Sequence, residues 1–190
     1  EEQPDASGTA ADCLPVQRLA IRKEVVGLQF VDDSHVFTAS KDNVLRLWSA
    51  GRCQQMVRGP QGLSGAVYVN GDAFLTTEGG ELMHYRLASG TCASQVEAGA
   101  AGTLAAARTS TGAAGVATAG GGELVHMWQT AADDDLHKVL TVKAAGARRV
   151  RSVTLALCSI RYQFALVFGT PAQSDETILF RSSLLSQWQD

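Results

Sequence analysis

The residues of this 190-residue chain best suited to metal binding or redox chemistry are its four histidines and four cysteines. His84 and His126 occupy matching places in two similar segments, GGELMHYR and GGELVHMW. A zinc site needs further ligands that converge on such a pair, and the spacing places none there. No two cysteines form a CxxC pair, which argues against a zinc knuckle or a thioredoxin-type site. We therefore predict no metal and no cofactor, and we expect both histidines on the surface or between packed elements.

Two charged clusters are candidates for binding a partner. Asp133, Asp134 and Asp135 form a carboxylate run, but it lacks the alternating spacing and the distal Glu of an EF-hand calcium loop. Adjacent like charges are usually solvated, and contact with another protein is the functional alternative. Arg148, Arg149 and Arg151 form the basic cluster of the chain. It suits RNA or an acidic protein surface, with a solvated loop as the alternative.

Enzymatic motifs are absent from the sequence. The glycine runs at 79–80 and 120–122 have no GxxxxGK[ST] context and no strand–GxGxxG–helix context, so we interpret them as turns. Ser, His and Asp are present, but no GxSxG elbow accompanies them. No carboxylates are paired by a motif for acid–base catalysis. We predict that the protein is not an enzyme.

Internal repeats organise the chain. The segments that start at Thr38, Thr76 and Thr118 align, and in each copy the last residue follows ten positions later, at Trp48, Arg86 and Trp128. A fourth, weaker copy ends at Arg181. Apolar residues alternate within each copy, which is the period of a β-strand with one packed face. These matched apolar pairs are Leu45/Leu47, Met83/Tyr85, Val125/Met127 and Ile178/Phe180.

Each unit of about 40 residues divides into four short strands. The expected ranges are 25–31, 35–40, 43–48 and 53–57, then 66–69, 73–77, 81–87 and 92–96, then 104–108, 115–119, 123–129 and 136–142. The fourth unit is expected to use 151–157, 163–168 and 177–180. Residues 98–119 are rich in Ala and Gly, which favours helix by propensity. The repeat alignment overrides that propensity and predicts thin strands in the least stable unit.

A family resemblance follows from these residues. The segment TASKDNVLRLWS resembles the end of a WD repeat, with Asp42 in a tight turn before an aliphatic strand that closes on Trp48. The resemblance implies an all-β fold of β-propeller blades, and a buried hydrogen-bond network of which Asp42, Thr38 and Trp48 would form a part. The other units depart from the pattern, with Gly122 for the turn Asp and Arg86 and Arg181 for the Trp. No unit has the Asp after Trp or the Gly-His pair of WD repeats.

Four blades are visible, whereas WD-type propellers most often have seven. We expect part of a larger propeller, with a closed ring of four as the alternative. The predicted organisation is a flexible acidic segment at residues 1–12, WD-like blades at 13–182 and a tail at 183–190.

Composition limits the function classes. Apolar residues make up 45% of the chain and charged residues 18%, which is enough apolar material for a core. The net charge of −3 gives no basic excess for nucleic acid as the main partner. Neither a spanning apolar run nor a signal peptide is visible, so we expect an intracellular protein, cytoplasmic or nuclear, with no membrane contact.

By analogy with the fold we expect a non-catalytic scaffold subunit that binds other proteins in a larger assembly. One alternative is an RNA-associated WD-repeat subunit of a ribonucleoprotein or ribosome-assembly complex, which would use Arg148 to Arg151. A second alternative is a propeller enzyme or small-molecule binder with its site in the central channel.

Overall fold

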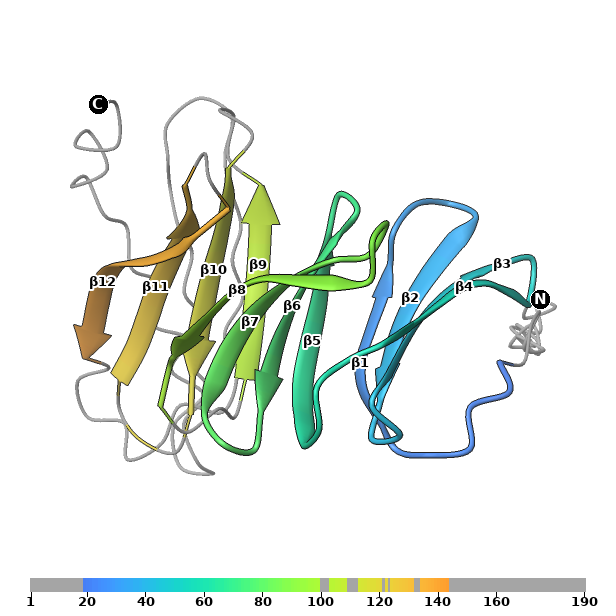
Figure 1. Cartoon of the computed structure of the whole chain (residues 1–190), viewed down its shortest axis with the longest axis horizontal. Coiled ribbons are helices and arrows are strands. Elements are labelled where there is room, and N and C mark those ends of the chain that lie inside the picture. The colour runs from blue at the N-terminus through green and yellow to red at the C-terminus, as the bar shows by residue number, and fades with distance from the viewer. Residues whose placement is uncertain are drawn as a thin grey trace, which may run out of the picture.

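The computed structural model describes residues 19–99, 103–108, 113–120, 122, 124–131 and 134–143. These residues form three four-stranded antiparallel sheets and no helix, so none of them belongs to a helix that would span a membrane. The sheets stand side by side in chain order, as three successive blades (Figure 1). The predicted all-β, four-stranded units are confirmed for the first three blades. The fourth unit, the segment 1–12 and the tail 183–190 lie outside the described residues.

Each blade is a meander in which sequence neighbours pair. Blade 1 contains β1 (Val25–Phe30), β2 (His35–Ser40), β3 (Val44–Ser49) and β4 (Arg52–Arg58). Blade 2 contains β5 (Leu63–Val69), β6 (Asp72–Thr77), β7 (Glu81–Arg86) and β8 (Thr91–Glu97). Blade 3 contains β9 (Thr103–Arg108), β10 (Ala114–Ala119), β11 (Leu124–Thr130) and β12 (Leu136–Lys143). The first strands β1, β5 and β9 are neighbours from blade to blade. The Ala-rich segment is therefore extended, as the repeat alignment predicts.

Tight turns set the strand pairing. Asn70 and Gly71 connect β5 to β6 with φ angles of +48° and +97°. Ala50 and Gly51 connect β3 to β4 in the same way, with φ angles of +48° and +73°. Two consecutive positive φ angles match the right-handed twist of the strands and fix a two-residue hairpin.

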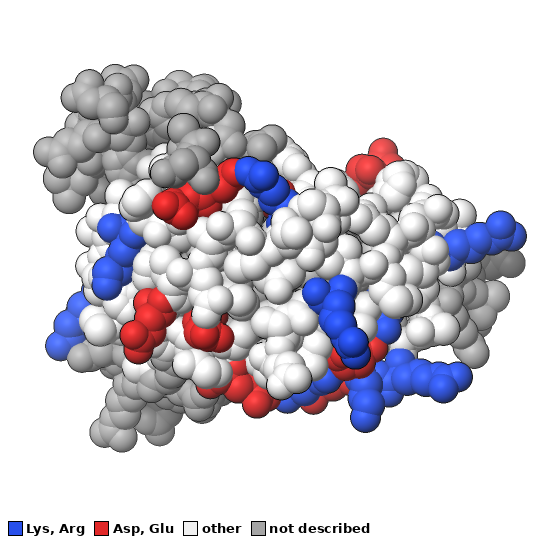
Figure 2. All heavy atoms as spheres, viewed as in Figure 1, with Lys and Arg blue, Asp and Glu red and all other residues white. Residues whose placement is uncertain are grey.

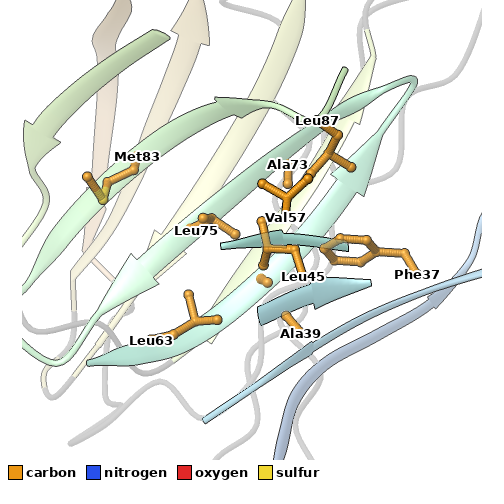
Figure 3. Close-up of a cluster of buried hydrophobic side chains, with 10 residues drawn as sticks. Phe37, Ala39, Leu45, Val57, Leu63, Ala73, Leu75, Met83 and Leu87 are labelled. Carbon is orange, nitrogen blue, oxygen red and sulfur yellow. The ribbon is translucent and has the colours of Figure 1, made fainter. Parts of the chain in front are cut away.

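Apolar side chains from two sheets form the core between blades 1 and 2, the blade 1–2 core (Figure 3). Phe37, Ala39, Leu45 and Val57 come from blade 1, whereas Ala73, Leu75 and Met83 are among those from blade 2. A second cluster, the blade 2–3 core, joins Phe74 and Leu82 to Val116, Trp128 and Leu136. In blade 2, β6 is buried along almost its whole length because one face of the sheet packs on blade 1 and the other on blade 3.

The register corrects the repeat alignment in blade 2. Val36 lies opposite Trp48 and Val116 opposite Trp128, and in blade 2 the corresponding pair is Ala73 with Tyr85. A bulge also directly precedes Trp48, Tyr85 and Trp128 on the third strand of each blade. Tyr85, and not Arg86, therefore takes the place of the tryptophan.

The error of one residue arises from the letters GGEL, which the segments of blades 2 and 3 share. In blade 2 the strand β7 begins at the Glu of these letters, Glu81, whereas in blade 3 the strand β11 begins one position later, at Leu124. The matched pair of blade 2 is consequently Leu82 and His84, and the predicted pair Met83/Tyr85 is wrong. Leu82 is fully buried like Leu45 and Val125, so the apolar pattern holds once the register is shifted. A slip of one residue moves every side chain of a strand to the other face of the sheet.

Candidate interaction surfaces

The turns of the blades form two rims. We call the rim that carries the turns β1–β2, β3–β4, β5–β6, β7–β8 and β11–β12 the first rim, and the opposite one the second rim. Carboxylates outnumber arginines in the described part of the first rim. The acidic residues there are Asp32, Asp33, Asp72, Asp134 and Asp135, and the arginines are Arg52 and Arg86. Over the face shown in Figure 2, acidic and basic side chains are interspersed, without one large patch of a single sign.

Asp32 organises the β1–β2 turn of the first rim. Its Oδ1 accepts hydrogen bonds from the backbone N–H groups of Ser34 at 2.7 Å and His35 at 2.8 Å, and from the Ser34 hydroxyl at 2.9 Å. His35 Nδ1 lies 2.9 Å from the same oxygen. These donors, led by the Ser34 N–H and the His35 ring, hold the pKa of Asp32 well below its usual range. The first rim therefore keeps a carboxylate charge here even in acid.

His84 lies at the junction of blades 2 and 3. Only 1% of the residue is exposed, and its ring stacks on Phe74 with centroids 4.8 Å apart. Nε2 lies 3.2 Å from Asp72 Oδ2, outside hydrogen-bond geometry, and Nδ1 lies 3.2 Å from the backbone oxygen of Asp134 in blade 3. Acceptor oxygens therefore face both ring nitrogens. Of the two expected locations, the surface or the space between packed elements, His84 takes the second.

The acidic run is partly used inside the molecule. Asp134, with a φ of +68°, pairs through its carboxylate with the guanidinium of Arg86, which projects from blade 2. Its backbone oxygen also faces His84, so this residue connects two blades. Asp135 is exposed and accepts the N–H of Ala131 with its backbone oxygen at 2.9 Å. Asp133, Arg148, Arg149 and Arg151 lie outside the described residues, so their assignment as an interaction surface stays a prediction.

His126 is not the counterpart of His84. It lies opposite Thr118 on the face that carries Trp128, and it corresponds to Arg46 and Met83. Its Nδ1 lies 2.9 Å from Thr141 Oγ1. Burial, aided by the charge of Lys138, lowers the pKa of His126. Within the part of the chain that the structure describes, no group of three or more His, Cys, Asp or Glu side chains is placed to hold a metal ion.

The hydrogen-bond network implied by the WD resemblance is split into two parts in blade 1. Trp48 Nε1 donates to Thr38 Oγ1 at 2.8 Å, and in blade 3 Trp128 Nε1 donates to Thr118 Oγ1 at 2.9 Å.

Asp42 does not join the hydrogen bond between Trp48 and Thr38. Its carboxylate accepts a hydrogen bond from the Ser40 hydroxyl at 2.6 Å and forms an ion pair with Arg46. Hydrogen bonding to Arg46 lowers the pKa of Asp42 to about 2, although its partial burial opposes the shift.

Comparison with solved structures identifies the architecture. The WD40 β-propeller domain of Doa1 superposes with a TM-score of 0.61 at 16% identity, over 82% of this chain and 51% of that one. The C-terminal WD40 domain of Sif2 gives 0.55 at 16% identity, over 76% of this chain and 44% of that one. A chain of the mitotic checkpoint complex gives 0.54 at 17% identity, over 70% of this chain and 43% of that one. The chain thus spans about half of these neighbours' length or less.

No family model and no curated protein matches the sequence. The likeness therefore rests on three-dimensional structure. Together with the three meander sheets and the repeated Trp–Thr hydrogen bond, it defines the described strands as blades of a WD-type β-propeller. This fold class agrees with the one that the residues around Trp48 predict.

Proposed function

We propose that the chain is a non-catalytic scaffold that binds other proteins in a larger intracellular assembly. The observation that carries the proposal is the set of short turns on the first rim, held in place by packed blades and rich in carboxylates. A rigid frame that presents several separate turns lowers the entropic cost of binding a partner. One structural neighbour is a chain of a multi-protein complex, which is consistent with this role.

The charges on the first rim indicate the kind of partner. Arg86 is paired with Asp134, whereas Asp33 is exposed and Asp32 is ionised. The surplus of negative charge favours a basic segment of a partner protein, because complementary potentials speed association and select partners. Asp134 and Asp135, two members of the predicted acidic contact, lie in the β11–β12 turn on this same rim.

The test is crosslinking and mass spectrometry on the native complex, followed by charge reversal. Asp33→Lys on the first rim should reduce recovery of the crosslinked partner, because it removes an exposed carboxylate without altering the Asp32 hydrogen bonds. The matched control is Glu97→Lys, an exposed carboxylate at the end of β8 on the second rim. Equal recovery with both variants would exclude the first rim. Crosslinks to RNA instead of protein would overturn the scaffold proposal.

A further inference from the structure

The three methionines of the chain differ in their access to solvent. Met56 on β4 is 62% exposed, whereas Met83 and Met127 are buried, at 8% and 2% exposure. A methionine thioether is oxidised to the sulfoxide, and methionine sulfoxide reductases return the sulfoxide to the thioether. An oxidant reaches a buried sulfur only when the structure opens locally. Met56 is therefore the methionine whose sulfur is open to an oxidant in the folded chain.

The exposure of Met56 is a property of the outer strand of a blade. By register, Gln95 and Thr141 take the place of Met56 on the outer strands of blades 2 and 3. Both residues are exposed, although blade 1 packs on that face of blade 2 and blade 2 packs on that face of blade 3. A neighbouring blade therefore leaves this position open to solvent.

The fold accepts a polar side chain at this position. Gln95 Nε2 donates a hydrogen bond to Glu81 Oε1 at 2.5 Å in blade 2. In blade 3, Thr141 Oγ1 lies 2.9 Å from Nδ1 of His126, the residue directly opposite it on β11. A polar pair across the third and fourth strands is thus compatible with the structure of a blade. An oxygen added to the sulfur of Met56 would meet the same kind of surroundings.

A hydrogen-bond donor lies directly opposite Met56. This residue is Arg46 on β3. Side chains opposite each other in an antiparallel pair have Cβ atoms about 4.5–5.5 Å apart, so they interact. The hydrogen bonds from Arg46 to Ser40 and Asp42 use Nη1 and Nη2, and the Nε–H group is a further donor. A sulfoxide oxygen on Met56 could therefore accept a hydrogen bond across the two strands.

We propose that Met56 is a site of reversible oxidation to methionine sulfoxide by hydrogen peroxide, and that Arg46 stabilises the oxidised side chain. The sulfur attacks one peroxide oxygen, so that an S–O bond forms as the O–O bond breaks. The sulfur loses two electrons, and the other oxygen leaves as hydroxide and takes up the proton of the transferred hydroxyl to give water. The inference is independent of the proposed function, because it concerns the outer strand of blade 1 and not the first rim.

The first test measures the oxidation rate of each methionine in the full chain. The chain is treated with dilute hydrogen peroxide and analysed by peptide mass spectrometry, in which fragment ions separate oxidation of Met56 from oxidation of the nearby Cys53. We expect Met56 to react at least about tenfold faster than Met83 and Met127, because the buried sulfurs require local opening. The control is the chain unfolded in urea, in which all three should react at the same rate. Equal rates in the folded chain would overturn the proposal.

The same oxidised chain tests reversibility. Methionine sulfoxide reductases of both types, one for each sulfoxide epimer, should return the Met56 peptide to its original mass without denaturant. A sulfoxide that the reductases remove only after unfolding would contradict a reversible site on the folded chain.

The last test isolates the role of Arg46. Oxidation of Met56 alone should leave the urea midpoint of the native chain unchanged, whereas in Arg46→Leu it should lower the midpoint, because the sulfoxide then faces no donor. Blade 2 carries the apolar Met83 in the place of Arg46, so the variant should fold. Arg58→Leu, which changes an exposed arginine of the same strand, is the matched control and should behave like the native chain. An equal fall in the native chain and in Arg46→Leu would exclude stabilisation by Arg46.

Discussion

The junction of blades 1 and 2 differs from the junction of blades 2 and 3 although the strands pair in the same way. At the first junction Phe37, Leu45 and Leu47 meet an apolar face of blade 2. At the second junction the equivalents of these three residues are Phe74, Leu82 and His84. On the blade 3 side of this junction, Val116 and Trp128 pack in the shared core, and the backbone oxygen of Asp134 on the first rim faces His84. A polar group is thus accommodated where a junction reaches a rim that supplies acceptor oxygens.

The difference identifies which interactions stabilise each junction. Apolar burial dominates the first, at about 25 cal/mol per Å² of apolar surface removed from water. The second adds polar contacts around His84 whose net contribution is small, because buried polar groups lose their hydration when they gain partners. We therefore expect large effects from core truncation and small ones from changes in the polar contacts.

The largest effect is expected for Phe37→Ala in the blade 1–2 core. Phe37 is completely buried, so the substitution removes its burial and leaves a cavity that costs about 3–5 kcal/mol of unfolding free energy. Urea denaturation measures this loss. The matched control is Phe30→Ala, the same change on the exposed face of the same blade, for which we expect a change within about 0.5 kcal/mol. Equal losses from both variants would contradict the assignment of the core.

A smaller effect is expected at His84, where the other blades carry Leu47 and Met127. His84→Leu should raise the free energy of unfolding by about 1 kcal/mol, because it replaces a buried polar ring with the apolar residue found in blade 1. Asp72, whose side chain is 31% exposed, stays accessible to water after the change. His84→Ala should instead cost about 2 kcal/mol by leaving a cavity. Thermal unfolding distinguishes the two variants, and equal destabilisation by both would show that the polar contacts dominate this junction.

The smallest effect concerns Asp42, which pairs with Arg46 and lies outside both cores. Its pKa of about 2 lies below its ordinary value of 3.8, so its contribution to stability is present above pH 3.8 and is lost as the pH falls toward 2. In Asp42→Asn this part of the acid dependence should be absent. We expect a difference of at most about 1 kcal/mol, since the pair is partly exposed. Denaturation of both proteins from pH 5 to 2 measures it, and parallel curves would contradict the ion pair's role.

The sequence predicted most of the fold because its signals were local. Alternating apolar residues and turn residues located all twelve described strands to within a few residues, and Trp48 with Thr38 indicated the hydrogen bond that the structure contains. The candidate surfaces were less accessible to sequence reasoning. Asp134 was expected in a solvated run, but it contacts Arg86 and His84 of another blade, and no local pattern reports a partner 50 residues away.

The amino-acid sequence determined that this protein is built from repeated antiparallel sheets, through its length, its turn residues and its period of two. Each strand needs only the alternation of apolar and polar residues along itself and a short hairpin to the next strand. The tertiary structure decided which face of each strand meets which blade. Matching of sequence letters aligned Met83 with Leu45. Strand register and the bulge before Tyr85 instead place Leu82 and His84 on the face of β7 that corresponds to the Leu45 face of β3. The physical reason is that side chains alternate between the two faces of a strand, so one residue of register reverses what is buried, and only packing between blades reveals the correct choice.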